Sequence, residues 1–267
     1  MTDDLIERVC TAYAWQRALG NATTRTPLVW LVSDTGNPDI WNANHACQIR
    51  AATPAQIDAV LQQADAALHH CAHRMFVIDP LTPPAFVARL ALADYRELTP
   101  TLQMVLSGAL RATPPPIDIR PVAGQADWQS LQHLVETDFA EGGRSHDGAH
   151  PVEVARGMVA DYRGKAPAYQ FFLARRDGTD CAYGAAALCD NGIGMVEDLF
   201  TLPAFRRSGI ASAIIAHAVD HVRARGATEA LIGAHISDTP KHLYARLGFA
   251  PVCLTREYLK HPERDQS

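Results

Sequence analysis

The sequence lacks the features that mark secreted, membrane and nucleic-acid-binding proteins. It opens on MTDDLIERVC, with two early acidic residues and no basic region before an apolar stretch, and it contains no apolar run of about 18 residues. Lys and Arg number 24 and Asp and Glu 29, a net charge of -5, and no long basic run concentrates the positive charge. We therefore expect a cytoplasmic protein with no membrane or nucleic-acid partner.

The sequence also has no pattern typical of a disulfide framework or a metal site. Its 6 cysteines include no CxxC pair, and a chain of 267 residues is large enough to fold without disulfides, which favours reduced thiols. Two clusters contain residue types that bind metal ions. One cluster lies at a helix end and the other continues an apolar stripe, so structural histidines explain both better than a metal site does. We expect no metal at either cluster. The first cluster comprises His69, His70, Cys71 and His73, and the second comprises His217, Asp220 and His221.

An internal repeat divides the chain into two halves. TPPAFVARLALA from Thr82 matches TPKHLYARLGFA from Thr239 in register, an offset of 239 − 82 = 157, and the flanking helical periodicity agrees at the same offset. Three consecutive prolines, residues 114–116, lie between the halves and favour an extended linker. The sequence predicts one domain over residues 1–112 and a second over 117–260.

Both halves alternate helical and strand patterns, which is typical of a mixed α/β fold. In the first half we expect helices over 5–19, from 55 and from 83, and strands at 28–32, near 47, at 75–78 and at 102–106. In the second half we expect helices over 128–139, from 152, from 209 and over 240–247, and strands at 117–120, 169–174, 182–188, 195–201, 230–234 and 252–258.

One loop in the second half is suited to binding a phosphate. A strand leads into Arg206-Arg207-Ser208-Gly209-Ile210-Ala211, and an apolar-periodic helix begins at once. A helix N-terminus offers free backbone N–H groups and the positive end of the helix dipole to an anion. On this motif alone, a plain helix start with solvated arginines remains an alternative.

The loop and the later stretch SDTPKHLYARLGF together resemble the GNAT superfamily of acyl-CoA-dependent N-acetyltransferases, whose phosphate-binding signature is Arg/Gln-x-x-Gly-x-Gly/Ala. The resemblance covers about Ile117 to Lys260. It implies two GNAT-like modules, each a curved mixed sheet flanked by helices. It also implies that the strands at 195–201 and 230–234 splay apart to admit acetyl-CoA as acyl donor.

The resemblance assigns roles to particular residues. Tyr244 matches the tyrosine that protonates the departing CoA thiolate, with core packing beside Leu243 and Leu247 as its alternative. Two positions depart from the family pattern, because Ser237 stands where Asn is common and Arg207 where Gly is common, which puts the affinity for CoA in doubt. The residues expected to bind the cofactor are Leu199, Phe200, Thr201, Arg206, Arg207, Ser208, Gly209, Ile210, Ala211, Ser212 and Ser237.

A base must remove the proton of an acceptor ammonium before the amine attacks the thioester. The string VEDLFTLPAFRRSGIAS is similar to polyamine and related small-amine acetyltransferases, in which the glutamate of a Glu-Asp pair is the base, so Glu197 is favoured over Asp198. A role of both acids as plain sheet-rim carboxylates stays open. The loop 138–147 and the strand end would form the acceptor side, with Asp198, His235 and Glu141 as substrate contacts.

The first half lacks this machinery, because Ile49 to Pro54 stands opposite the phosphate loop and Val87 opposite Tyr244. The resemblance thus implies a degenerate N-terminal half and a C-terminal half that acetylates a primary amine, with a small molecule as the favoured acceptor. The alternatives are a protein or peptide acceptor and a non-catalytic acyl-CoA-binding regulator. A second apolar stripe on the helix after Gly209 is covered either by the first half or by a second copy in a homodimer; it comprises Ile215, Val219 and Val222.

Overall fold

A computed structural model of the protein describes residues 3–142 and 151–262, and these form two compact units. Unit 1 comprises residues 1–103, 234–238 and 252–267, and unit 2 comprises residues 104–233 and 239–251. Strands β6 (Thr101–Leu106), β11 (Glu229–His235) and β12 (Ala250–Lys260) contribute residues to both.

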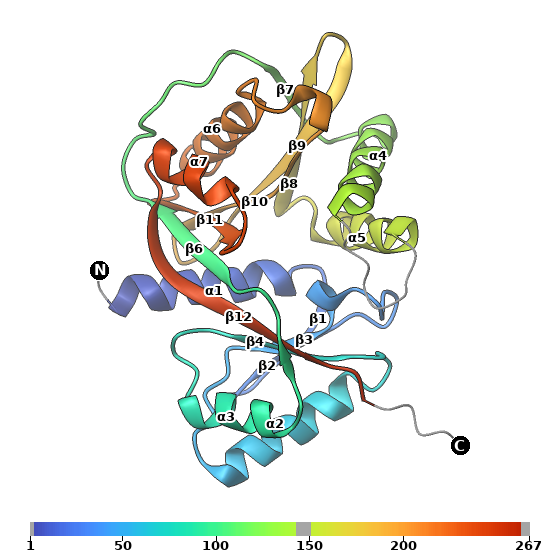
Figure 1. Cartoon of the computed structure of the whole chain (residues 1–267), viewed down its shortest axis with the longest axis vertical. Helices are drawn as coiled ribbons and strands as arrows, with labels where there is room; N and C mark the ends of the chain where they lie inside the picture. The colour runs from blue at the N-terminus through green and yellow to red at the C-terminus, as the bar shows by residue number, and fades with distance from the viewer. Residues whose placement is uncertain (1–2, 143–150, 263–267) are drawn as a thin grey trace. The chain divides into compact units, whose positions relative to one another are not determined.

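Unit 1 is a mixed sheet with helices (Figure 1). Its strands follow the order β1-β2-β3-β4-β12, with β5 also paired to β12. All the pairings are antiparallel except β3 with β4, where Ala46 lies opposite Phe76. The further elements are α1 (Asp3–Ala18), β1 (Ala22–Arg25), β2 (Trp30–Ser33), η1 (Trp41–Ala43), β3 (His45–Cys47), α2 (Pro54–Ala67), β4 (Arg74–Ile78), α3 (Pro84–Leu92) and β5 (Arg96–Glu97).

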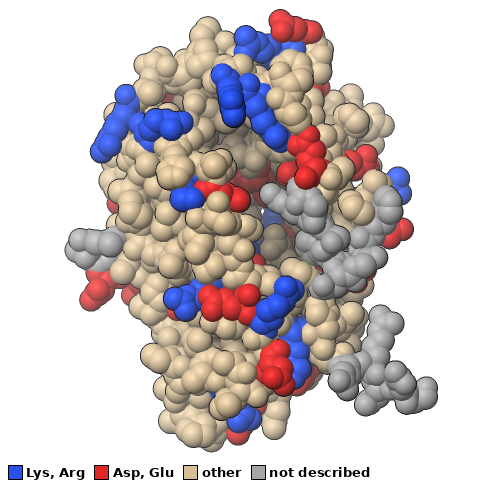
Figure 2. Space-filling view, in the orientation of Figure 1, with Lys and Arg blue, Asp and Glu red and all other residues tan. Residues whose placement is uncertain are grey.

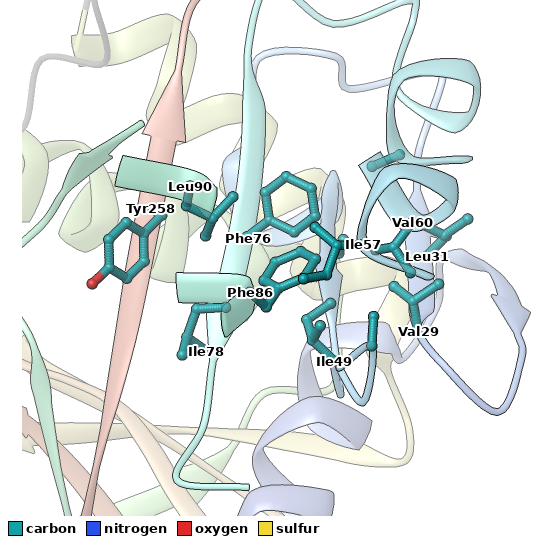
Figure 3. Close-up of a cluster of buried hydrophobic side chains, with 13 residues drawn as sticks. Val29, Leu31, Ile49, Ile57, Val60, Phe76, Ile78, Phe86, Leu90 and Tyr258 are labelled. Carbon is teal, nitrogen blue, oxygen red and sulfur yellow. The ribbon is translucent and has the colours of Figure 1, made fainter. Parts of the chain in front are cut away.

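The core of unit 1 joins α2 and α3 to the sheet (Figure 3). Ile57, Val60 and Ala64 recur at helical spacing on α2 and are buried, so this face of the helix packs into the core. Phe76 of β4 meets Phe86 of α3 edge to face, with ring centroids 5.4 Å apart. The apolar periodicity of the sequence therefore directs both helices onto one hydrophobic cluster.

Unit 2 has the strand order β11-β10-β9-β8-β7. The strands pair antiparallel as far as β10, and β10 pairs with β11 in parallel. The elements are β7 (Asp118–Pro121), α4 (Gln125–Gly142), α5 (Pro151–Lys165), β8 (Tyr169–Arg176), β9 (Thr179–Leu188), β10 (Ile193–Thr201), η2 (Pro203–Phe205), α6 (Ile210–Arg223) and α7 (Pro240–Leu247).

Helices cover both faces of this sheet. Successive strand residues point to opposite faces, and on β8 Phe171 contacts Trp128 of α4 and Tyr162 of α5, while Phe172 contacts His217 of α6. Gly184 of β9 allows α6 to approach closely, because a Cβ there would lie 2.5 Å from Ile214 Cγ2. The helix thereby lies directly over the strands that carry the predicted site.

The mixed α/β prediction is confirmed, and every helix expected in the two halves is present. The repeat is visible as a parallel strand pair joined through a helix in each unit, β3-α2-β4 and β10-α6-β11. The end of the chain departs from the expected 117–260 domain. Residues 256–260 of β12 pair with β4, so residues 252–267 belong to unit 1.

Candidate active site

The predicted splay between two parallel strands has a structural counterpart. The pairing of β10 with β11 runs from Ile193–Glu229 to Val196–Ile232 and stops there among the described residues, although β10 continues to Thr201. On its other edge β10 stays paired with β9, through Phe200–Tyr183 and Thr201–Ala182. The backbone of Leu199, Phe200 and Thr201 thus lies past the end of the parallel ladder, where an extended ligand can pair with a strand edge.

A bulge in β10 separates the two predicted carboxylates. Glu197 lies opposite Ala185, but Phe200 lies opposite Tyr183, so β10 has two intervening residues and β9 has one. Asp198 is the residue with left-handed backbone, at φ 54°. Its carboxylate accepts hydrogen bonds from Tyr162 Oη at 2.9 Å and Tyr169 Oη at 2.8 Å. Glu197 is half-buried beside it.

The loop before α6 carries the predicted anion site. Arg207 and Gly209 both have left-handed backbone, at φ 60° and 84°, and the turn is supported by Ser208 Oγ donating to Phe205 O at 2.5 Å. Gly209 is the N-cap of α6 and supplies no side-chain cap. The first backbone N–H groups of α6 therefore receive no hydrogen bond from the side chain of the N-cap residue. An anion site at a helix N-terminus needs such N–H groups as donors. Ile210 is buried, while Ala211 and Ser212 are half-buried.

The linker packs directly on this loop. A Cβ added to Gly209 would lie 2.6 Å from Pro115 Cγ, so Pro115 occupies the space on that side of the glycine. Arg111 N donates to Leu247 O at 3.0 Å at the end of α7. The structure thus gives Gly209 a reason that the sequence reading missed: its left-handed backbone and the linker both require glycine, apart from any ligand.

Glu141 and Arg206 form an ion pair at 2.6 Å between the end of α4 and the loop. Arg206 Nε also donates to Thr201 O at 2.9 Å, and its guanidinium lies 5.7 Å from the Phe200 ring centroid. Glu141, predicted as a substrate contact, therefore contacts the phosphate loop. Residues 143–147 of the predicted acceptor loop lie outside the described residues.

The remaining predicted residues occupy different surroundings. Tyr244 lies on α7, is 6% exposed and packs against Phe249 with ring centroids 6.3 Å apart. His235 and Ser237 are exposed and belong to unit 1, and His235 Nδ1 lies 3.9 Å from Asp238 Oδ2.

Figure 2 shows a hollow in the upper half of this view of the surface. Acidic side chains are visible inside the hollow, and basic and acidic side chains are mixed around it. Among the described residues visible in this view, no patch of a single charge sign covers the face.

The two histidine clusters have structural partners. His217 and His221 pack edge to face on Phe172, and burial lowers the pKa of both, that of His221 to about 4. His73 lies 3.1 Å from Asn44 O, and burial lowers its pKa to about 4. In the part of the chain that the structure describes, no group of three His, Cys, Asp or Glu residues is arranged to hold a metal ion.

Unit 1 closes the equivalent site with its own side chains. From the last parallel pair to the helix, unit 2 has 210 − 196 = 14 positions and unit 1 only 54 − 46 = 8. Thr53 and Gln56 form a capping box that satisfies N–H groups at the start of α2. Arg50 and Asp79, which follow β3 and β4, form an ion pair at 3.1 Å. These contacts occupy the place in unit 1 that corresponds, by the repeat, to the predicted anion site of unit 2.

Sequence reasoning missed the tyrosines and aspartate around the bulge. Tyr162 and Tyr169 contact Asp198, and Tyr183 Oη donates to Asp138 Oδ2 at 3.1 Å. These residues come from α4, α5, β8 and β9, and no local spacing relates them. The only available signal was the apolar pattern of each element, which identifies Tyr169 and Tyr183 as inward-facing.

Two further predictions concern residues outside the site. The second apolar stripe of α6 is buried within the single chain, since Ile215, Val219 and Val222 are all 0% exposed. All six cysteines are free thiols. No helix among the described residues is long and apolar enough to cross a membrane.

Comparison with known proteins agrees with this geometry. The family profile described as "Acetyltransferase (GNAT) domain" matches residues 167–251, which span β8 to the start of β12. The match assigns a GNAT acetyltransferase domain to residues 167–251, which lie within the second half of the chain and include the loop before α6. No curated protein matches the sequence.

Solved structures share the fold over nearly the whole chain. A GCN5-related N-acetyltransferase from Kribbella flavida aligns with a TM-score of 0.68 at 17% identity, covering 98% of this chain and 97% of its own. A tandem GNAT protein from the clavulanic acid biosynthesis pathway aligns with a TM-score of 0.60 at 13% identity, covering 98% and 97%. A conserved protein of unknown function from Staphylococcus epidermidis aligns with a TM-score of 0.68 at 14% identity, covering 90% of this chain and 94% of its own.

Proposed function

We propose that unit 2 transfers an acetyl group from acetyl-CoA to the primary amine of a small molecule by direct attack. Two features of β10 support the proposal. Its parallel pairing with β11 ends at Val196 and Ile232. The strand then continues toward the N-terminus of α6, where the N-cap residue Gly209 provides no side-chain cap. A splayed strand edge suits the amides of pantetheine, and a helix N-terminus with Arg206 and Arg207 suits a pyrophosphate.

The donor is expected to lie along β10. The backbone of Leu199 to Thr201 pairs with the pantetheine arm, and the amides from Arg207 to Ser212 hold the pyrophosphate. Acetyl-CoA is a substrate in this account, and no metal takes part.

The chemistry needs one base and one acid. Glu197 takes a proton from the acceptor ammonium, and the free amine attacks the thioester carbonyl carbon. The tetrahedral intermediate then collapses: the attacking nitrogen loses its second proton to solvent, the C–S bond breaks, and Tyr244 donates its phenolic proton to the CoA thiolate. The proton held by Glu197 returns to solvent, and the tyrosine is reprotonated from water. Asp198 contacts two tyrosines and is assigned no proton transfer.

The test is acetyl-CoA turnover on a panel of small primary amines and a panel of peptides. We expect turnover on a small amine and a kcat about 100-fold lower in Glu197→Gln, because general base catalysis contributes about this much. Acetyl-CoA affinity should be unchanged in that variant. Glu153→Gln, an exposed acid on α5, is the matched control and should retain full activity.

Three outcomes would change the proposal. Turnover on peptides alone would make the acceptor a protein or peptide amine. Acetyl-CoA binding without turnover on either panel would favour a non-catalytic acyl-CoA-binding regulator. Full activity in Glu197→Gln would remove that residue as the base.

A further inference from the structure

One residue of the β10 bulge has a left-handed backbone, a conformation that is uncommon for residues other than glycine. Asp198 has φ 54°, in the left-handed region, where residues with a Cβ are strained. Strained residues persist only where the surrounding contacts hold them in place. The contacts of Asp198 therefore determine whether β10 keeps its bulge.

Two phenols from different elements hold the Asp198 carboxylate. Tyr162 of α5 donates to Oδ1 at 2.9 Å, and Tyr169 of β8 donates to Oδ2 at 2.8 Å. Each carboxylate oxygen thus receives one hydrogen bond, and the two donors come from a helix and a strand. Hydrogen bonds to a charged acceptor are stronger than those between neutral groups.

The phenols themselves are fixed by packing. Tyr169 is 0% and Tyr162 is 3% exposed, and both rings pack against Phe171, with centroid distances of 5.1 Å and 4.5 Å. Burial and the nearby Asp198 charge raise the pKa of Tyr162 well above its usual value. Tyr162 therefore stays protonated and remains a donor at neutral pH.

We propose that Tyr162 and Tyr169 are positioning residues that clamp Asp198 and thereby maintain the bulge after Glu197. The bulge lies one residue beyond Val196, where β10 and β11 stop pairing. The clamp thus holds the backbone of Leu199 to Thr201 in its splayed course. Its catalytic consequence rests on the proposed function, whereas its effect on the backbone does not.

The first experiment measures amide hydrogen exchange in the free protein, without any ligand. In the double variant Tyr162→Phe/Tyr169→Phe we expect the peptide containing residues 197–201 to exchange at least about tenfold faster, because two hydrogen bonds to a charged group are lost. Tyr258→Phe is the matched control, since Tyr258 is a buried phenol that donates to Glu97 at 2.8 Å in unit 1. It should leave this peptide unchanged.

Variants of Asp198 separate the clamp from backbone strain. Asn keeps one acceptor oxygen and tolerates the left-handed conformation. The Asp198→Asn variant should therefore keep part of the wild-type protection from amide exchange at residues 197–201. Asp198→Ala loses both acceptors and leaves the strain, so it should exchange as fast as the double tyrosine variant. If the double variant does not fold by circular dichroism, Tyr162→Phe and Tyr169→Phe are measured singly, each with a smaller increase expected.

A second readout connects the clamp to the donor site. Acetyl-CoA affinity should fall about tenfold in the tyrosine variants, and Tyr258→Phe should bind like the wild type. Unchanged exchange at residues 197–201 in folded tyrosine variants would overturn the clamp. A wild type that binds no acetyl-CoA would instead overturn the proposed function, and the exchange result would still decide the clamp.

Discussion

At the scale of single residues, the structure assigns different tasks to neighbours that look alike in the sequence. Glu197 and Asp198 are adjacent acids at the bulge, and Asp198 accepts hydrogen bonds from Tyr162 and Tyr169. The sequence favoured Glu197 as the base because successive strand residues face opposite sides. It could not predict the tyrosine contacts, because these depend on how α5 and β8 pack against β10.

Buried histidines make stability depend on pH. Burial lowers the pKa of His73 from 6.5 to about 4, so between these values the unfolded chain binds a proton that the folded chain does not. Stability is then fully present above about pH 6.5 and is lost as the pH falls toward 4. The expected contribution of His73 is about 3 kcal/mol, at about 1.4 kcal/mol per pKa unit.

Urea unfolding at pH 7.5 and pH 4.5 checks this dependence. His73→Gln keeps a donor for Asn44 O but does not titrate, so it should lose less stability on acidification than the wild type. His69→Gln changes an exposed histidine on the same segment and serves as the control. An equal loss of stability in the wild type and in His73→Gln would contradict the assignment.

At the scale of elements, hydrophobic periodicity predicted most helices and strands. The α6 pattern predicted a helix with two covered apolar stripes, and the structure buries both of them. Strand β1, Ala22–Arg25, was missed because Ala-Thr-Thr-Arg has no alternation of large apolar residues. The pairing of β12 with β4 was missed because strand partners are set by tertiary contacts and not by local pattern.

The contact between α6 and the sheet depends on one glycine. A Cβ at Gly184 would lie 2.5 Å from Ile214 Cγ2 and 2.7 Å from Leu199 Cδ2. Gly184→Ala should therefore displace α6 and lower the free energy of unfolding by about 2 kcal/mol, as overpacking does. Thermal and urea unfolding measure the change.

Gly124→Ala is the matched control, because a Cβ there meets nothing within 4 Å. Its stability should stay within about 0.5 kcal/mol of the wild type, as for other surface substitutions. Equal stabilities of Gly184→Ala and the wild type would show that the sheet and α6 can separate without cost.

At the scale of the whole molecule, the repeat predicted two related modules, of which only the second has the phosphate-binding signature. The absence of the glycine signature over Ile49–Pro54 predicted a degenerate first module. In the structure, a shorter connection, a capping box and the Arg50–Asp79 ion pair occupy the corresponding region of unit 1. The packing of Pro115 on Gly209 could not be predicted, because a proline-rich linker has no pattern that indicates what it contacts.

We propose that the chain has one acyl-CoA site, at the N-terminus of α6 in unit 2. Isothermal titration of acetyl-CoA into the whole protein tests it most directly. The account predicts one equivalent bound per chain and about tenfold weaker binding in Arg206→Ala, which loses a charged contact. Arg176→Ala, an exposed arginine on β8, is the control and should bind like the wild type. Two equivalents per chain, or none, would contradict the account.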